Sequence, residues 1–474
     1  MPTDRSTAVR RRRWSGVICV IVLAATAGGC ASHTQKLAAV RAELVADRPD
    51  RALTEFGKHK EKPSDLLYLL ERGYLEQAAG NFAASNAAFE AAELRAEDLF
   101  TKSVTGELAS LVTSDNVLPY RGYAHELVMI HYYRAFNYLA LDLYDDALVE
   151  ARKANRRLTE LADEREGKNA YANDAFMQYL TGLLYEDAGE RNDAAVSYRD
   201  AWRGYADYRS LYGVKAPDGL AAGLYRSLRA IGADDEAAEL ADRFPDSDIA
   251  ADDANVIVFV ETGFAPYLLP VDIILPIFDR DNDKRYRDCK NCEDEYASVL
   301  VGRYGDNIYS YSASGTKLDH VLRFSFPRMS DYTSAVDWVE VVRPDATTGV
   351  VPLEPAQPLT AIAHGEFNDR LPKLLLKTIA RALVKEFARR TAKKTDGVLG
   401  ALINIANVVT EQADTRSWLF LPGRIRMMRL RLPPGTATLG LIFHDANDLA
   451  IDRKNVTVTV EEGRISLVRV RSYQ

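Results

Sequence analysis

The residue type with the most specific chemistry in this chain is cysteine, which occurs at positions 19, 30, 289 and 292. Cys289-Lys-Asn-Cys292 has the spacing of half a zinc ribbon, but no second cysteine pair exists, and the seven histidines show no ligand spacing such as His-x3-His. A thioredoxin-like redox motif would need a surrounding βαβ pattern, which is missing. We therefore predict a local disulfide between Cys289 and Cys292, which an oxidising compartment favours, and no metal or other cofactor.

Cys30 ends a segment with the pattern of a bacterial secretion signal. Arg10–Arg13 are basic, and Trp14–Ala25 form an apolar run that is too short to span a bilayer comfortably. Thr26-Ala-Gly-Gly-Cys30 then resembles the site at which a bacterial lipoprotein is cleaved and acylated, although an alanine stands where leucine is commoner. Cys19 is a poorer candidate, because a bulky isoleucine precedes it. We predict a signal peptide over residues 1–29 and lipid attachment at Cys30.

Three alternatives stay open: an ordinary cleaved signal with a leftover cysteine, an N-terminal membrane anchor, and a twin-arginine signal at Arg11-Arg12-Arg13-Trp14. After Cys30, Ala31 and Ser32 lack the aspartate that usually retains such lipoproteins in the inner membrane. The predicted location is therefore the periplasmic face of the outer membrane.

The charge balance excludes one class of partner. Without residues 1–29, which contain five Arg and one Asp, the chain keeps 445 residues with 55 basic and 67 acidic side chains, a formal net charge of −12. So acidic a chain is not expected to bind nucleic acid. With 47% apolar residues it is long enough for two or three domains, and no later apolar stretch is long enough to predict a membrane span.

Signatures of catalysis are missing from the sequence. Asp279, Asp281 and Asp283 alternate like the start of a calcium loop, but Lys284 and Lys290 replace the Gly and Glu that such a loop requires, so we predict a solvated acidic loop. No Gly-x-Ser-x-Gly, supported Ser-x-x-Lys or Walker sequence occurs. We therefore predict that the protein is not an enzyme.

Basic residues recur every four positions on a long helix expected over about residues 369–394, with Pro372 in its first turn. They are Lys373, Lys377, Arg381, Lys385 and Arg389. One interpretation is a stripe that meets lipid phosphates or the anionic stems of the cell wall. The other is an ordinary solvated face, opposite an apolar face made by Leu375, Ile379, Leu383 and Phe387.

The segment Glu411-Gln-Ala-Asp-Thr-Arg-Ser-Trp418 is polar and connects a predicted helix to a predicted strand. We interpret Asp414 and Arg416 as a buried charge pair that positions this connection between helix and strand, and Trp418 as a side chain that anchors it in the core. The alternative interpretation is a binding groove.

Residues 64–245 have the composition and apolar periodicity of helices. Small and aromatic residues recur with the spacing of tetratricopeptide units, in which small side chains let two antiparallel helices approach closely. The registers are Leu69, Gly73, Gly80, Phe82, Phe89 and Ala92; Ala135, Tyr138, Tyr144, Ala147, Ala151 and Ala154; Gly182, Tyr185, Gly189, Ala194, Tyr198 and Ala201; and, more weakly, Gly232, Ala237 and Ala241. The predicted turn residues Gly80, Asp142, Gly189 and Gly232 lie 62, 47 and 43 positions apart, so the repeats are divergent. An irregular helical bundle is the alternative.

Short β-branched runs dominate from residue 252, after a boundary at Pro245-Asp-Ser-Asp248. Strands are expected at residues 255–260, 271–277, 321–326, 336–342, 417–421, 424–432, 436–443, 456–460 and 465–470. Pro433-Pro434-Gly435 and Glu462-Gly463 indicate two hairpin turns, and Met427-Met428 indicates a bulge. Two hairpins of this kind favour a small β-sandwich. A helix over about 397–412, apolar on nearly every side, must be covered.

The predicted fold is therefore multidomain, α followed by α+β. A signal peptide (1–29) and an acylated tether (30–63) precede a tetratricopeptide-like helical solenoid (64–245). A mostly β, sandwich-like domain (252–474) then contains an inserted helical pair over about 369–412.

Three stretches resemble a family of Gram-negative tetratricopeptide-repeat outer-membrane lipoproteins, and the resemblance covers most of the mature chain. They are Asp115-Asn116 with Pro119-Tyr120, Arg370-Leu-Pro, and Gln412-Ala-Asp-Thr-Arg-Ser-Trp418 with Leu421-Pro422. The family has no assigned reaction, so the resemblance implies an architecture and a location, and no catalytic residue. Its members look like envelope proteins, sometimes discussed beside lipoproteins that activate penicillin-binding proteins.

We therefore expect a non-enzymatic scaffold or adaptor in cell-envelope assembly. Its concave helical surface would bind a periplasmic protein, and its C-terminal domain would dock to peptidoglycan, to the membrane or to a second partner. Two other classes stay open. One is an envelope hydrolase or glycan-binding protein with a site around Asp414, Arg416 or His364. The other is a structural component of a secretion or motility machine.

Overall fold

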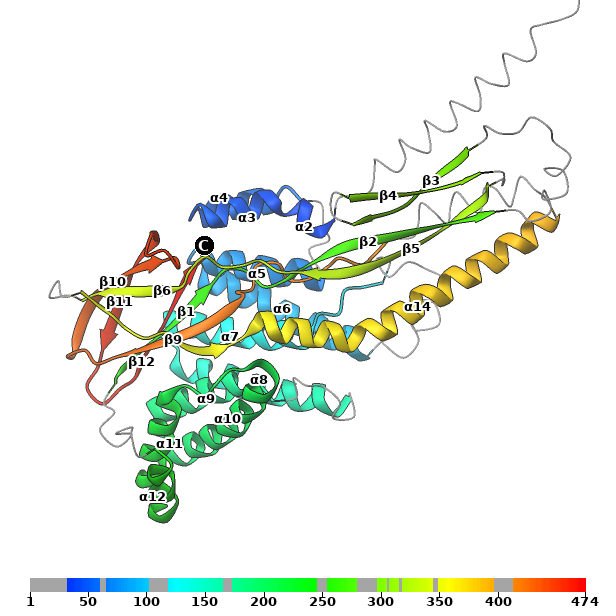
Figure 1. Ribbon diagram of the computed structural model, residues 1–474. Coiled ribbons are helices and arrows are strands. Elements are labelled where there is room, and N and C mark those ends of the chain that lie inside the picture. Colours follow the sequence, from blue (N-terminus) through cyan, green and yellow to red (C-terminus); the bar gives the residue numbers. More distant parts are fainter. Residues whose placement is uncertain are drawn as a thin grey trace, which may run out of the picture.

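The computed structural model describes residues 32–59, 65–101, 118–164, 173–244, 254–278, 296–304, 307–314, 318–343, 348–395 and 412–474 of the 474-residue chain. Helices make up the regular structure before residue 245, and strands dominate after it, together with one long helix (Figure 1). The predicted order, α and then α+β, is confirmed at this level. None of the helices in these ranges has the length and apolar content that crossing a membrane requires.

The helical part starts inside the segment predicted to be a tether. It contains α2 (His33–Lys36), α3 (Ala38–Val45) and α4 (Pro49–Phe56). Leu44 and Phe56 are buried in the core that these helices share with the rest of the helical part. The ring of His33 lies 2.7 Å from the buried carboxylate of Glu71. The folded body therefore begins almost directly after Cys30 in the sequence.

The other helices before residue 245 pair in order. The pairs are α5 (Leu66–Ala78) with α6 (Phe82–Thr101), α7 (Ala124–Ala140) with α8 (Tyr144–Glu164), α9 (Ala175–Asp187) with α10 (Arg191–Tyr212), and α11 (Asp218–Ala230) with α12 (Asp234–Asp242). The predicted turn residues are confirmed, because Gly80, Asp142, Gly189 and Gly232 have φ values of 80°, 58°, 78° and 76°. Glycine adopts this left-handed conformation without strain, and aspartate tolerates it.

Within two of these pairs, a glycine on the first helix lets an aromatic ring of the second helix reach the backbone. A Cβ atom on Gly73 would lie 2.7 Å from the ring of Phe89, and one on Gly182 would lie 2.4 Å from the ring of Tyr198. Both rings are fully buried. These are the close approaches that the small-residue spacing predicts.

The described strands form three sheets. The inner sheet has the order β12-β1-β9-β8, the outer sheet β11-β10-β6-β7, and the arm sheet β4-β3-β2-β5. The strands are β1 (Val256–Thr262), β2 (Tyr267–Phe278), β3 (Tyr296–Tyr304), β4 (Asn307–Ser314), β5 (Leu318–Ser330), β6 (Trp338–Val342), β7 (Thr348–Val350), β8 (Glu354–Gln357), β9 (Arg424–Leu430), β10 (Gly435–His444), β11 (Ala450–Val460) and β12 (Ser466–Ser472). The strand predicted at 417–421 is wrong, because this segment is irregular and its apolar side chains fill the helical core.

β1 is buried over its whole length because both of its faces cover a hydrophobic core. Ile257 and Phe259 belong to the core that the inner sheet shares with the helices. Val256, Val258 and Val260 belong to the core between the inner and outer sheets. A strand covered on both faces does not alternate apolar and polar residues. The chain thus stacks three layers in the order helices, inner sheet, outer sheet.

The bulge predicted at Met427-Met428 is wrong. β9 pairs with β1 in continuous antiparallel register, with Met427 opposite Phe259 and Met428 opposite Val258. Met427 faces the helical core and Met428 faces the outer sheet, so two consecutive apolar residues need no shift in register. The irregularity lies between β8 and β9 instead, at Pro355–Gln357.

The two predicted hairpins are also wrong. Pro433–Gly435 leads from β9 in the inner sheet to β10 in the outer sheet, and Glu462-Gly463 leads from β11 back to β12. In this part of the chain the hairpin lies between the two predicted turns. It joins β10 to β11 through a turn in which the Asp445 carboxylate accepts hydrogen bonds from the backbone of Asn447 and Leu449. Both predicted turns exist, but they connect layers instead of neighbouring strands.

The long helix α14 (Leu359–Thr395) starts ten residues before the predicted position. Pro372, expected in the first turn, therefore lies inside the helix, where its ring leaves the Asn368 carbonyl without a helical donor. The first turns of α14 contact the helical part, and the rest runs outward beside β5 (Figure 1). We call the arm sheet together with α14 from Leu371 onward the arm.

Candidate functional site

The inner face of the helix pairs, where we expected a partner protein, is covered by the same chain. Phe259 of β1 contacts Phe136 of α7 and Phe176 of α9, with ring centroids 5.5 and 5.6 Å apart. Phe420 stacks on Tyr74 of α5 at 5.9 Å. All five rings are buried, so this face is part of a core and not a free groove.

A buried charge cluster lies within this contact. Glu261 of β1 is fully buried, and its carboxylate lies 3.1 Å from Arg469 and 3.5 Å from Arg471 on β12. Tyr132 of α7 donates a hydrogen bond of 3.0 Å to the same carboxylate. Burial opposes the charge on Arg469, yet Glu261 and the surrounding tyrosines raise the pKa of Arg469 above its ordinary value. Arg469 therefore keeps its charge, and the contacts of Glu261 with β12 and α7 tie the helices to the inner sheet.

The described parts of the three stretches that carry the family resemblance meet at the start of α7. Glu126, in the first turn of α7, accepts hydrogen bonds from the Tyr120 hydroxyl at 2.5 Å, the Tyr123 backbone at 2.8 Å and the Trp418 backbone at 2.7 Å. Arg370 of α14 lies over the Tyr123 ring at 4.2 Å. We call this meeting point the α7 junction.

A second carboxylate, Glu366 of α14, caps the same helix. It accepts hydrogen bonds of 3.2 Å from the backbone of Ala124 and of His125, and His125 Nδ1 lies 2.5 Å from it. The first N–H groups of a helix have no partner within the helix, and a negative charge is favourable there. Glu366 and His125 are both buried, so the contact also fixes α14 against α7.

Asp414, Arg416 and Trp418, which the sequence singled out, lie in the α7 junction. Arg416 pairs with Asp414 through two hydrogen bonds of 2.8 Å and donates a third to a backbone carbonyl before α7. The prediction that this pair is buried is wrong, because the side chains of Arg416 and Asp414 are 23% and 26% exposed. Trp418 is 1% exposed and packs on aromatic rings of the helical core. His364 is the third residue of the hydrolase site considered as an alternative. Its Nε2 atom lies 2.5 Å from the carboxylate of Asp331.

Sequence reasoning missed both carboxylates of the α7 junction. Glu126 has a local signal, since a glutamate at the third position of a helix is typical of a capping box. Glu366 has none, because its partners lie 241 and 242 positions away. Donors of the chain itself surround both carboxylates, an arrangement that positions segments and does not present a base to a substrate.

We expect Glu126→Gln to lower the free energy of unfolding by about 2–3 kcal/mol, because glutamine keeps one acceptor oxygen and turns an amide toward backbone donors. Urea denaturation would measure the loss, and hydrogen exchange at the Trp418 amide should accelerate. Glu160→Gln is the matched control, since Glu160 pairs with arginines at the surface of α8. Unchanged exchange at Trp418 would contradict the role of Glu126.

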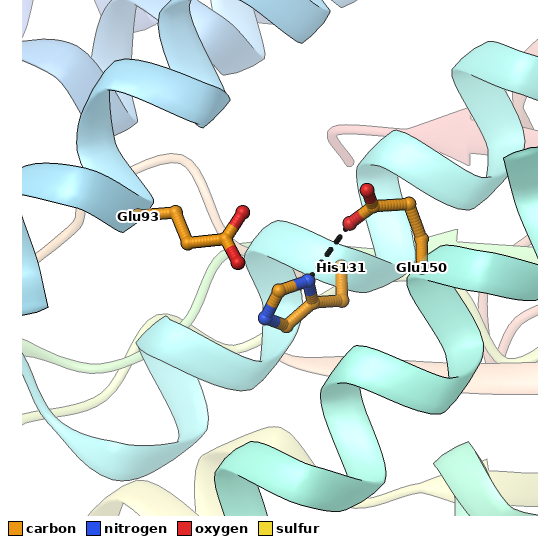
Figure 2. A group of neighbouring side chains, drawn as sticks. All are labelled: Glu93, His131 and Glu150. Carbon is orange, nitrogen blue, oxygen red and sulfur yellow. Dashed lines mark hydrogen bonds and ion pairs between the residues drawn. The ribbon is translucent and has the colours of Figure 1, made fainter.

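Figure 2 shows a different cluster, in which Glu93 of α6, His131 of α7 and Glu150 of α8 offer ligand atoms within 4.8 Å of one another. Cations of the chain already occupy it. Arg134 lies 2.6 Å from Glu93 and 3.2 Å from Glu150, and Lys153 lies 3.3 Å from each. Burial opposes the charge on Glu150, but His131, Arg134 and Lys153 lower its pKa. A metal would have to displace both cations, so we interpret the cluster as an ion-pair network that joins three helices.

Two hollows lie beside the second helices of successive pairs. The larger, of about 380 Å³, is lined by Arg156, Thr159, Gln178, Tyr185, Asp193, Val196, Ser197 and Asp200. The smaller, of about 20 Å³, adjoins Glu93 and His131 and shares Arg156 with the larger one. The smaller hollow is about the size of one water molecule. The larger one is lined by side chains of both charge signs and by Tyr185 and Val196.

Glu354 of β8 has a pKa near neutrality. Burial raises its pKa to about 7, although its Oε2 accepts a hydrogen bond of 2.6 Å from the Asp218 backbone. The folded state thus binds this proton more tightly than the unfolded chain. The resulting stability is present in acid and is lost as the pH rises through 7.

Accordingly, Glu354→Gln should be more stable than the parent by about 1–2 kcal/mol at pH 8 and equal to it near pH 4. Glutamine keeps the acceptor for Asp218 and carries no charge to bury. Thermal melting between pH 4 and pH 8 would measure the difference. A variant that is less stable than the parent at pH 8 would show that the carboxylate is favourably ionised.

Several predicted features lie outside the described residues. They are Cys30, the pair Cys289 and Cys292, the acidic loop at 279–283, the domain boundary at 245–248 and nearly all of the helix at 397–412.

The structure contradicts the predicted basic stripe of α14 at Arg381 and the predicted covered apolar face, whereas Lys373 is exposed and Lys377 is partly exposed. Arg381 is only 1% exposed, whereas Leu383 and Phe387, expected on the covered face, are 62% and 74% exposed. The small buried residues Thr378 and Ala382 lie beside Arg381 and let neighbouring elements approach that side. α14 therefore turns an apolar face outward.

Comparisons with known proteins identify no family. No family model and no curated protein matches the sequence. Among solved structures, the crystal structure of BtubC (BKLC) from P. vanneervenii is similar over 44% of this chain and 72% of that chain, with 16% identity and a TM-score of 0.28. A similarity this low supports no argument about fold or function.

Proposed function

We propose that the protein is a lipid-anchored, non-enzymatic scaffold in cell-envelope assembly. A lipid on Cys30 holds it at the periplasmic face of the outer membrane. Divergent tetratricopeptide-like helix pairs present a surface to a periplasmic partner protein, and the strand-rich part contributes contacts to the membrane or the wall. Four turn residues with positive φ and the glycine approaches at Phe89 and Tyr198 support the repeat assignment.

The closed inner face is the observation that carries the partner assignment. Since strands of the same chain fill that face, we assign the partner contact to the second helices α6, α8 and α10 instead. These helices expose apolar side chains, with Leu94 61%, Val149 43% and Val196 47% exposed. The 380 Å³ hollow beside Val196 adds both charge signs to this surface. We call the three exposed residues and the hollow the outer-helix surface.

The arrangement of the polar clusters supports a proposal that includes no reaction. Within the described residues, the carboxylates at the α7 junction and at Glu261 accept hydrogen bonds or ion pairs from the chain itself. Such saturation favours a structural role for these groups.

Acylation is tested by Cys30→Ser in cells labelled with a palmitate analogue. The variant should lose the label almost completely and keep residues 1–29, because the lipoprotein peptidase cleaves before an acylated cysteine. Cys19→Ser is the matched control and should be labelled and cleaved like the parent. Labelled Cys30→Ser protein would refute the anchor.

The partner surface is tested by a photo-crosslinking amino acid placed at Val196 in cells. A light-dependent adduct with a periplasmic protein is expected there, and none from the control position Thr436, an exposed residue of β10. If Leu94, Val149 and Val196 all give only uncrosslinked protein, the scaffold proposal fails.

A further inference from the structure

The outer part of α14 exposes a continuous apolar stripe. Leu376, Ile379, Leu383 and Phe387 follow one another at intervals of three and four residues and are 70%, 49%, 62% and 74% exposed. Val384 beside them is 51% exposed. Residues at this spacing share one helix face, so the five side chains form one surface. Contiguous apolar surface of this kind marks a contact with another molecule or with a membrane.

The same part of α14 is strongly basic in an otherwise acidic protein. Residues 373–394 contain eight basic residues and one acidic residue, Glu386. The basic residues are Lys373, Lys377, Arg381, Lys385, Arg389, Arg390, Lys393 and Lys394. Lys373 is exposed and Lys377 is partly exposed, and by helical spacing both lie beside the stripe. An exposed apolar face with basic neighbours is typical of helices that lie in the interface of an anionic bilayer.

The proposed anchor lies next to the arm that carries this stripe. α2 contacts β2, β2 pairs with β5, and β5 packs against α14. Ser32, which caps the start of α2, is two residues after Cys30, so a lipid on Cys30 is attached close to α2 in the sequence. His33 is buried beside Glu71, so no long flexible tether separates α2 from the body. A membrane that holds the lipid would therefore lie close to the base of the arm.

We propose that the apolar stripe of α14 is a second membrane contact, which inserts between the headgroups of anionic phospholipids and sets the orientation of the anchored protein. The proposal deepens the proposed function, because it rests on the lipid anchor for its location. Its physical basis does not depend on the lipid anchor. The exposed apolar side chains would insert between the headgroups, and the basic side chains beside them, of which the structure describes Lys373 as exposed and Lys377 as partly exposed, would attract the negative headgroups.

The test uses the mature chain with Cys30→Ser, made without residues 1–29, so that acylation plays no part. Flotation with vesicles of phosphatidylglycerol and phosphatidylethanolamine should recover the protein, and vesicles of phosphatidylcholine should recover much less. The variant Leu376→Ser, Ile379→Ser, Leu383→Ser, Phe387→Ser should float about tenfold less. Leu141→Ser, Leu143→Ser, Leu211→Ser, Ile231→Ser is the matched control and should float like the parent, because it removes four exposed apolar side chains of the helical part that lie outside the outer-helix surface.

Three results would overturn the membrane contact. Equal flotation of the four-serine variant and the parent would show that the stripe does not bind lipid. A lower melting temperature of the four-serine variant would show that another segment of the same chain, such as residues 397–411, covers the stripe. A parent that is dimeric and a variant that is monomeric in sedimentation would assign the stripe to a second copy. Each of these results leaves the labelling and crosslinking tests of the scaffold unaffected.

Discussion

Replacing Glu261 by glutamine is expected to lower the free energy of unfolding by about 3–5 kcal/mol. The carboxylate is fully buried and is the ion-pair partner of two arginines on β12. Without it, two positive charges would stay in the contact between the helices and the inner sheet with no partner of opposite sign there. Removing one member of a buried charge cluster costs more than the cluster contributes as a whole, because the remaining charges are left uncompensated.

Urea denaturation of the mature chain, followed by tryptophan fluorescence, would measure this loss. Glu236→Gln is the matched control, because Glu236 and its partner Arg199 are 47% and 29% exposed, and surface pairs contribute only about 0–1 kcal/mol. Superimposable unfolding curves for Glu261→Gln and the parent would mean that the cluster is not needed to join the two parts.

The second large effect is expected from Gly182→Ala. The added Cβ atom would lie 2.4 Å from the ring of Tyr198, which cannot move away, because Gly223 of α11 approaches the same ring from another helix. The Tyr198 hydroxyl is also held by a hydrogen bond of 2.6 Å to Glu186. We expect a loss of about 3 kcal/mol, at the upper end of the range for overpacking in a core.

Thermal melting would measure this loss against Gly349→Ala, the matched control on β7. At Gly349 an added Cβ atom meets no neighbour within 4 Å, so the melting temperature should stay close to that of the parent. If Gly182→Ala melts like Gly349→Ala, the spacing of small residues has no bearing on how the helices pack.

The sequence was most informative where the signal is local. Gly80 and Asp142 could be recognised as turns because few residues tolerate a positive φ. Gly73 could be matched to Phe89 because the spacing of a helix pair brings these two positions together. In each case the residues that decide the conformation lie within one helix pair.

The order of the strands in the sheets could not be predicted from such local signals. The turn after β9 and the turn after β11 have the residues of tight turns, but such residues do not say which sheet the next strand joins. That choice depends on β1, which pairs with β9 on one side and with β12 on the other. Only the tertiary arrangement contains this information.

The prediction of which face of α14 is covered was wrong for a related reason. Its basic and apolar residues both recur with helical spacing, so the pattern alone does not say which face is covered. The rule that charged faces are solvated gave the wrong answer at Arg381, which is buried. The polar contacts at the α7 junction were likewise hidden, since Glu126 and Trp418 are 292 positions apart.

The double burial of β1 has a consequence for the order in which this protein can fold. The helical core is completed by residues of β1, by Phe420 and by Tyr473, and β1 pairs in parallel with β12, which is 210 positions further along the chain at Val256 and Ser466. Contacts of such high sequence separation form late, because the intervening chain has to be closed first. The helix pairs therefore cannot bury their inner face while the chain is still being synthesised. A chain truncated before β12 should leave the apolar inner face of the helices exposed and should therefore aggregate. A chain that crosses a membrane unfolded, and folds only when it is complete, does not expose this face in a partly folded form.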